Sequence, residues 1–122
     1  MNQPHLFTNS PVKASSILGT SVVNTKHESL GDIKEMVVDP RTGKIAYAVV
    51  SFGGFLGMGE KLFAIPFSSF EYNLEKNVYV LDVPKERLEG APGFDPDHWP
   101  RMSDEKWNRD LYTYYGRSPY WE

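Results

Sequence analysis

The stretch "LGDIKEMVVDPRTGKIAYAVVSF" (residues 30–52) predicts two β-strands joined by a tight turn. Its first part, "DIKEMVVD" (32–39), alternates apolar and polar residues with a period of roughly two, which is typical of a half-buried strand. "DPRTGK" (39–44) favours a chain reversal, because proline presets φ and glycine accepts a positive φ. "IAYAVVSF" (45–52) is rich in β-branched and aromatic residues and is apolar on both faces. We therefore expect a central strand that is buried on both sides.

The flanking sequence predicts further short strands, with no helix between them. "TSVVN" (20–24) and "KLFAIPF" (61–67) have strand composition, and Pro66 indicates an edge position or a bulge because proline cannot donate to a ladder. "FEYNLEKNVYVLDV" (70–83) predicts a hairpin that turns near residues 75–77. Closing such a sheet removes its exposed edges. The predicted fold class is mainly β: a small antiparallel β-barrel or closed meander, with a helical, aromatic-rich C-terminal extension.

Length and composition narrow the class of protein. The 122-residue chain has room for one domain, and its net charge of −3 argues against a general nucleic-acid binder, which needs a basic face. It holds no cysteine, which removes disulfides, thiolate zinc sites and cysteine nucleophiles. The sequence has neither a signal-peptide pattern nor the roughly 20 apolar residues that span a bilayer. We expect a cytoplasmic protein with a flexible arm (1–13), a barrel (14–90) and an extension (91–122).

The C-terminal extension predicts one helix. Residues 94–122 contain all three tryptophans and four of the seven tyrosines. Ser103 is expected to N-cap the helix and Gly116 to end it. Between them, apolar residues recur at helical spacing: Trp107, Leu111, and Tyr114 or Tyr115. Residues 84–93 predict a further one or two helical turns, which begin at a proline in the first helical position.

The aromatic side chains of this extension have two interpretations. They pack as core on the outside of the barrel or across its end, or they contact a partner protein or a second copy of the chain. Under the second interpretation the contact residues are Trp107, Tyr115 and Trp121, since Trp and Tyr are frequent interface anchors. Stacking on nucleic-acid bases is disfavoured, because the same segment carries several carboxylates.

The glycine-rich stretch "SFGGFLGMGEK" (51–61) resembles a phosphate-binding loop only in part. Such a loop needs Gly-Lys-Ser/Thr followed by a helix. Here Glu60 intervenes before Lys61 and would repel a phosphate, and a predicted strand follows. The glycines are instead typical of a strand connection. Its apolar residues either fold back over the barrel or contact a partner: Phe55, Leu56 and Met58.

The sequence contains no recognisable constellation for catalysis or cofactor binding. Its histidines, His5, His27 and His98, lie far apart and fall in different predicted elements. "DPDH" (95–98) could supply a weak metal site, although a solvated turn explains it as well. We therefore predict a protein that is not an enzyme, with no catalytic, cofactor-binding or metal-binding residues.

The chain resembles the PRC-barrel domain family over about residues 16–85. The resemblance rests on the order of "SSILGTSVVN", "LGDIKEMVVDPRTGKIAYAVVSFGG" and "EKLFAIPFSSF", in which a glycine-led strand, a turn, a long apolar strand and "FAIPF" follow one another. The segment "APGFDPDHWPRMSDEKWNRDLYTYYGRSPYW" is similar to an extension of stand-alone bacterial members. This resemblance implies a small, mainly antiparallel β-barrel.

In this family the domain binds protein. It forms the cytoplasmic part of the photosynthetic reaction-centre H subunit, which packs against a membrane core, and the C-terminal domain of the ribosome maturation factor RimM. The chain lacks the membrane helix of the former and the first barrel of the latter, so neither role transfers directly. The family has no shared catalytic motif. The resemblance thus implies a protein-interaction or assembly module, expected to form a homodimer, and leaves peripheral contact with a membrane complex open. Two alternatives are a small-ligand or metal-binding barrel and a ribosome-associated factor like RimM.

Overall fold

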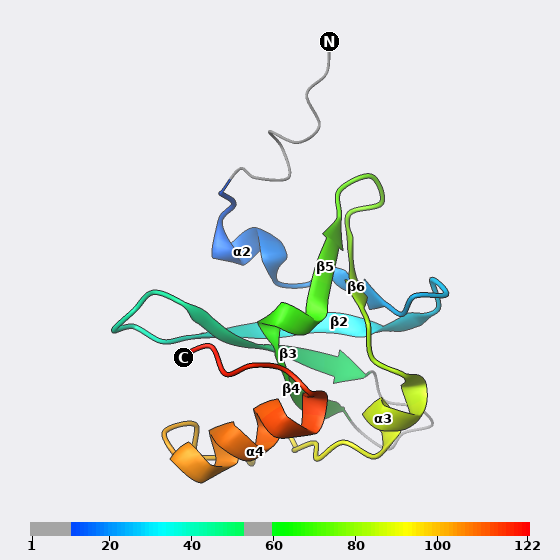
Figure 1. Cartoon of the computed structure of the whole chain (residues 1–122). Helices are drawn as coiled ribbons and strands as arrows, with labels where there is room; N and C mark the ends of the chain where they lie inside the picture. Colours follow the sequence, from blue (N-terminus) through cyan, green and yellow to red (C-terminus); the bar gives the residue numbers. More distant parts are fainter. Residues whose placement is uncertain (1–10, 53–59) are drawn as a thin grey trace.

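The structure is a computed structural model that describes residues 11–52 and 60–122. Within these residues, six strands and three α-helices follow one another, and Figure 1 labels them. In order they are α2 (Ala14–Ile17), β1 (Ser21–Val23), β2 (Ser29–Val38), β3 (Ile45–Phe52), β4 (Lys61–Pro66), the 3-10 turn η2 (Phe67–Ser69), β5 (Phe70–Asn73), β6 (Val78–Leu81), α3 (Lys85–Glu89) and α4 (Glu105–Tyr115). The prediction of short strands without an intervening α-helix is confirmed for β1 to β3 and for β4 to β6, and the connection between β3 and β4 lies outside the described residues.

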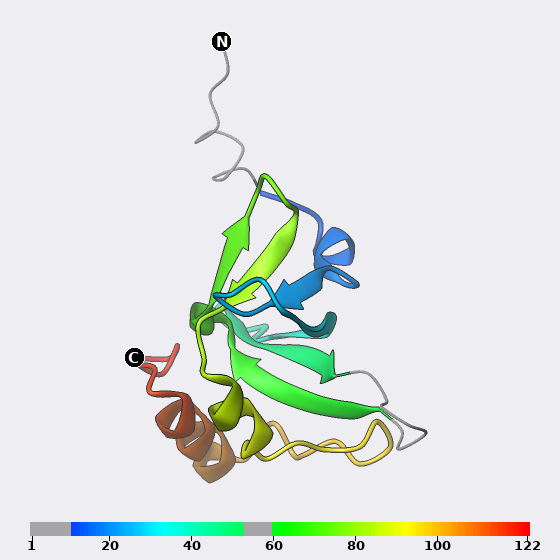
Figure 2. The ribbon, with the colours of Figure 1, turned by 90° about the vertical axis from the view of Figure 1, so that its right-hand side faces the viewer.

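The strands form one curled sheet in the order β4-β3-β2-β1-β6-β5. Four neighbouring pairs are antiparallel, whereas β1 and β6 run parallel, with Val22 opposite Tyr79. The sheet is therefore mixed, and Figure 2 shows it bending into a half-barrel whose outer strands are β4 and β5. The predicted small barrel with a helical extension is confirmed.

Strand β3 lies in the interior of the sheet and is buried on both faces, as predicted. Every residue from Ala46 to Ser51 is buried, because β2 and β4 flank the strand and further side chains cover both of its sides.

Gly31, in the hairpin that β2 and β3 form, lies very close to the backbone of β3. A Cβ on Gly31 would lie 2.1 Å from the backbone oxygen of Ser51, so a larger residue cannot fit without moving the strands apart.

The predicted turn and edge features are also confirmed. The backbone N–H of Asp39 donates to the Lys44 carbonyl at 2.8 Å, and Gly43 adopts a φ of 78°. Pro66 ends the outer strand β4, where its missing N–H disrupts no ladder. The outer edge of β4 is covered at its start, because Leu62 and Phe94 exchange backbone hydrogen bonds at 2.8 and 2.9 Å.

Helix α4 occupies the position predicted for it and ends at Gly116, but its first cap was assigned one residue too early. Asp104, not Ser103, is the N-cap, and its carboxylate accepts a hydrogen bond from the Trp107 backbone N–H at 3.1 Å. A carboxylate also interacts favourably with the helix dipole at this position. Pro84 likewise stands just before α3 rather than within it. Among residues 11–52 and 60–122, none of the helices is long and apolar enough to cross a membrane.

Candidate functional site

On the side of β3 and β4 that faces α4, Tyr47 packs in one layer with Trp107 and Tyr112 of α4 and with Tyr120 and Trp121 of the tail; we call this layer the aromatic face. Helix α4 packs on β4 and buries Leu111, Tyr112 and Tyr115 (Figures 1 and 2). The Tyr112 hydroxyl donates to the carbonyl of Ala46 at 2.5 Å, and its ring lies 5.4 Å from that of Tyr47. Burial raises the pKa of Tyr112 well above its usual range. One side of α4 is therefore part of the core.

The C-terminal tail continues this layer across the β2–β3 turn. The Tyr120 hydroxyl donates to a carboxylate oxygen of Asp39 at 2.8 Å, and Lys44 Nζ donates to the Tyr120 carbonyl at 3.3 Å. Hydrogen bonds from the Arg41 side chain and from Tyr120 lower the pKa of the buried Asp39 to about 2. The sequence predicts only that the Asp39 side chain bonds to backbone amides of its turn. This role is confirmed, because the Arg41 backbone N–H donates to the Asp39 carboxylate at 3.0 Å. The hydrogen bond from Tyr120 was not predicted.

The structure separates the predicted contact residues of the extension. Trp107 is half-buried with its ring 5.5 Å from that of Tyr47. Tyr115 is 9% exposed and belongs to the core of this chain. Trp121 is 36% exposed and packs edge-on against Tyr112 at 5.5 Å. The other three predicted contact residues, Phe55, Leu56 and Met58, lie outside the described residues.

The residues that border the glycine-rich stretch have structural roles. The Ser51 hydroxyl donates to a Glu60 carboxylate oxygen at 2.5 Å, and Lys34 Nζ lies 3.5 Å from the same oxygen. The Ser51 hydrogen bond, reinforced by Lys34, lowers the pKa of Glu60. Lys61 begins β4 and Leu62 is buried in it, so a strand follows the stretch as predicted. A phosphate-binding loop would need a helix there.

The candidate metal ligands are dispersed. His98 Nδ1 lies 3.9 Å from one carboxylate oxygen of Asp95, whose other oxygen lies 3.7 Å from Lys61 Nζ. His27 occupies the turn between β1 and β2 with a φ of 64°. His5 is outside the described residues. Within residues 11–52 and 60–122, no three His, Asp or Glu side chains are grouped to hold a metal ion.

A second surface, which sequence reasoning did not single out, lies at the opposite end from α4. We call it the apolar end, and it comprises the α2 segment together with the β5–β6 hairpin. Both segments stand at the same end of the molecule in Figures 1 and 2. They carry four large apolar side chains that are between 38% and 62% exposed: Val12, Leu18, Tyr72 and Leu74. Periodicity could not reveal them, because Val12 and Leu18 flank a short helix, Tyr72 lies in the four-residue strand β5 and Leu74 lies in the hairpin turn.

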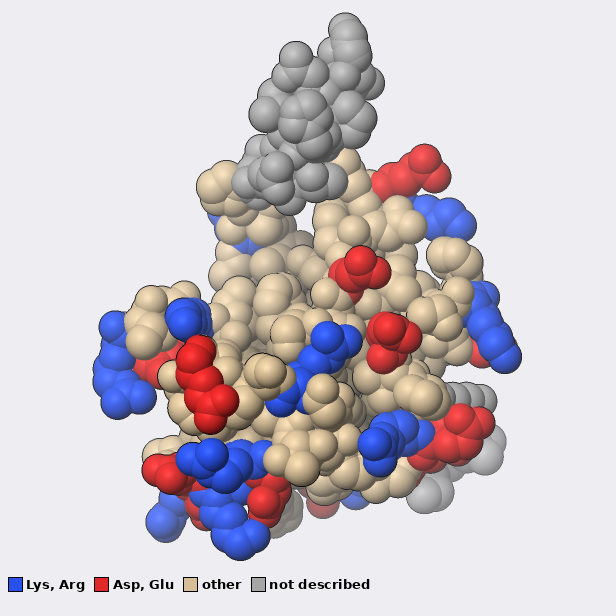
Figure 3. Space-filling model, viewed as in Figure 1, with Lys and Arg blue, Asp and Glu red and all other residues tan. Residues whose placement is uncertain are grey.

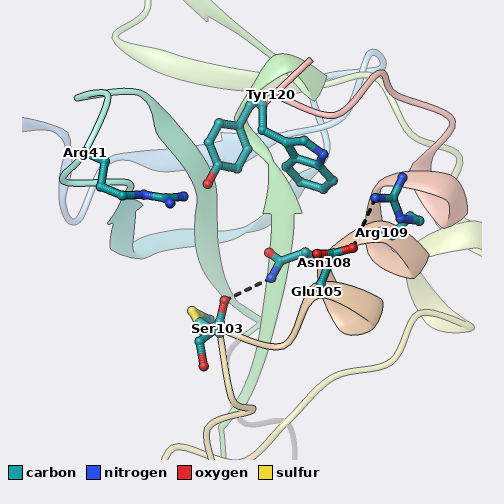
Figure 4. Close-up of a pocket in the computed structure, with 8 residues that line it drawn as sticks. Arg41, Ser103, Glu105, Asn108, Arg109 and Tyr120 are labelled. Carbon is teal, nitrogen blue, oxygen red and sulfur yellow. Dashed lines mark hydrogen bonds and ion pairs between the residues drawn. The ribbon is translucent and has the colours of Figure 1, made fainter.

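A groove opens beside the aromatic face, between the β2–β3 turn, the start of α4 and the tail. It encloses about 540 Å³ and is lined by Arg41, Met102, Ser103, Glu105, Asn108, Arg109, Tyr120 and Trp121. Figure 4 shows Arg41 and Arg109 reaching in from opposite sides, with Tyr120 and Asn108 between them. On the face in Figure 3, acidic and basic side chains are interspersed rather than gathered by sign.

The curled six-stranded sheet and its covering helix define a small half-barrel domain. The chain belongs to the PRC-barrel domain family, whose sequence pattern matches residues 12–88. Members of this family are generally non-catalytic. No curated protein sequence matches the chain. The predicted family membership is thereby confirmed, and α4 and the tail lie beyond the matched region.

Proposed function

We propose that this PRC-barrel is a non-enzymatic assembly module, and that its first partner is a second copy of the chain bound through the apolar end. The observation that carries the proposal is that Val12, Leu18, Tyr72 and Leu74 are exposed on segments that stand at the same end of the molecule. Scattered apolar side chains are normal on a protein surface, whereas several at one end mark an interaction site. The aromatic face, in contrast, is occupied by the chain's own α4 and tail.

The apolar end is already ordered for binding. The Tyr72 ring packs against that of Tyr79 at 5.0 Å, and its hydroxyl donates to Asn77 Oδ1 at 2.6 Å. A tyrosine held in this way loses little freedom when a partner covers it, which favours association. Strand β5 is also an outer strand of the sheet, and outer strands readily pair with another chain.

The proposal is tested by the mass of the protein in solution over a range of concentrations. Wild type is expected to exceed the monomer mass, and a Leu18→Ser, Tyr72→Ser, Leu74→Ser variant to remain a monomer. Val38→Ser is the matched control, because Val38 is also exposed and apolar but lies at the end of β2. Circular dichroism verifies that each variant folds.

Two outcomes would contradict the proposal: a wild type that stays monomeric into the millimolar range, or an apolar-end variant that keeps the wild-type mass. Parallel variants test the earlier predicted contacts, with serine at Phe55, Leu56 and Met58 in one and at Trp121 in another. Loss of association only in these variants would move the interface to those residues. The alternatives of a ligand-binding barrel or a ribosome-associated factor remain predictions without a specific observation in their favour.

A further inference from the structure

The groove beside the aromatic face has a feature that the assembly proposal does not use: a cationic side chain on each of two opposite walls. Arg41 projects from the β2–β3 turn and Arg109 from α4, and their side chains are 85% and 52% exposed (Figure 4). Glu105 is the one acidic residue of the lining. The carboxylate of Asp39, which pairs with Arg41, is buried behind the lining, so the positive charge of the groove is confined to the exposed guanidinium groups.

Both arginines keep donors available for a ligand. Two nitrogens of Arg41 lie 3.4 Å from the Asp39 carboxylate, and Arg109 Nη2 lies 3.5 Å from Glu105 Oε1. These separations are long compared with the roughly 2.7–2.9 Å of a strong charge-assisted hydrogen bond. A guanidinium has about five N–H donors in a planar fork that matches a carboxylate. An incoming carboxylate can therefore use the N–H donors that these internal pairs leave free.

Between the arginines lies a rigid aromatic floor. Tyr120 is held at both ends, through its hydroxyl to Asp39 at 2.8 Å and through its carbonyl to Lys44 at 3.3 Å. The Tyr120 and Trp121 rings pack edge-on at 5.2 Å, and the Arg109 guanidinium lies 5.9 Å from the centre of the Trp121 ring. Such a floor offers an apolar contact whose geometry is set before a ligand arrives.

Asn108 fixes the base of the groove. Its side-chain nitrogen donates to the carbonyls of Met102 at 2.9 Å and Asp104 at 2.8 Å, and its oxygen accepts from the Tyr47 hydroxyl. The amide is thus fully engaged and holds α4 at a constant distance from β3. The two arginine walls consequently belong to one rigid frame, although they are 68 positions apart in the sequence.

We propose that this groove binds a carboxylate carried next to an aromatic or large apolar group. The arginines receive the carboxylate, and the apolar group lies on Tyr120 and Trp121. Glu105 limits the charge that the groove accepts, which favours one carboxylate over a polyanion. This site is distinct from the apolar end, so it can exist whether or not the chain forms dimers.

The test is an NMR titration of the ¹⁵N-labelled full chain with N-acetylphenylalanine, with its neutral amide as the matched probe. We expect saturable shifts at the Trp121 indole and the Asn108 side-chain amide, with a dissociation constant of about 1 mM for so small a ligand. The amide, which lacks the carboxylate, is expected to bind about tenfold more weakly or worse. A tripeptide-extended probe, acetyl-Ala-Ala-Ala-Phe with a free carboxylate, separates the two sources: tighter binding indicates a peptide, and equal binding a small acid.

Variants of the charged groove residues test whether those residues determine the affinity for the carboxylate. Arg41→Ala with Arg109→Ala should weaken binding of N-acetylphenylalanine about tenfold or more, and Glu105→Gln should strengthen it. Lys106→Ala is the control, because Lys106 lies on the same helix and pairs with Asp110 outside the groove lining. If the arginine variant folds poorly, the affinity of Glu105→Gln alone shows whether removing a negative charge from the groove strengthens binding. Equal binding of acid and amide, an unchanged affinity in Glu105→Gln, or an equal loss in Lys106→Ala would overturn the proposal.

Discussion

The aromatic face and the apolar end are two surfaces of one curled sheet, and they differ in what covers them. On the aromatic face, α4 and the tail bury Leu111, Tyr112 and Tyr115 against β3 and β4. At the apolar end, Leu18, Tyr72 and neighbouring apolar side chains remain exposed. Both surfaces are apolar in sequence, but within residues 11–52 and 60–122 only the aromatic face is covered by other parts of the chain.

The difference assigns separate roles to the family domain and to the segment that follows it. The PRC-barrel match covers residues 12–88 and therefore contains the apolar end, whereas α4 and the tail lie beyond it. The extension completes the core of the domain, and under the proposed function the exposed part of the domain itself binds the partner. Aromatic residues in the extension are accordingly not evidence of an interface by themselves.

The largest expected difference is in stability, between Tyr112→Ala and Tyr72→Ala. Tyr112 is 2% exposed and is hydrogen-bonded to Ala46, so its truncation leaves a cavity and should cost about 3–5 kcal/mol in the free energy of unfolding. Tyr72 is exposed, and its truncation should cost about 1 kcal/mol or less. Urea denaturation at a concentration where both variants are monomeric measures both values.

Similar losses in the two variants would break the comparison, because they would show that the extension contributes no more to the core than an exposed hairpin residue does. A loss of association in Tyr112→Ala with association retained in Tyr72→Ala would reverse the roles of the two surfaces.

A smaller effect concerns the bond that ties the tail to the β2–β3 turn. Hydrogen bonds from Arg41 and Tyr120 lower the pKa of Asp39 from 3.8 to about 2. A carboxyl group with a lowered pKa stabilises the fold fully above about pH 4 and loses that contribution as the pH falls through about 2. Tyr120→Phe removes one donor, so it should raise the Asp39 pKa toward 3.8. The pH range over which Asp39 loses its contribution to stability should then become narrower.

The Asp39 pKa is followed by NMR of its carboxyl carbon, and stability by urea denaturation between pH 2 and pH 5, the range in which the group titrates. Tyr114→Phe is the matched control, because the Tyr114 hydroxyl donates to the Arg87 carbonyl at 2.6 Å and not to Asp39. An Asp39 pKa that is the same in wild type and Tyr120→Phe would show that the tail does not hold the turn.

Local patterns were sufficient to predict the strands and turns. The alternation in β2, the reversal at residues 39–44 and the doubly apolar β3 each follow from a few adjacent residues. Pro66 indicated either an edge position or a bulge for β4, and the structure shows the edge position. Gly31, which the family resemblance had included, is explained by the backbone oxygen of Ser51 that a Cβ would meet.

Long-range contacts could not be predicted in the same way. The hydrogen bond between Tyr120 and Asp39 joins residues 81 positions apart, and the path between α3 and α4 has no periodic pattern that would reveal it. The same segment brings α4 beside the β2–β3 turn, so the position of Arg109 opposite Arg41 in the groove could not be predicted either. The parallel pairing of β1 with β6 also reflects the route of the chain rather than the composition of either strand.

Hydrogen exchange at low and high protein concentration tests most directly which surface binds a partner. We expect backbone amides of residues 12–18 and 70–78 to exchange more slowly at high concentration, while those of residues 105–121 exchange at the same rate in both. Slower exchange confined to residues 105–121, with the apolar end unchanged, would contradict the assignment of the extension to the core and of the apolar end to a partner.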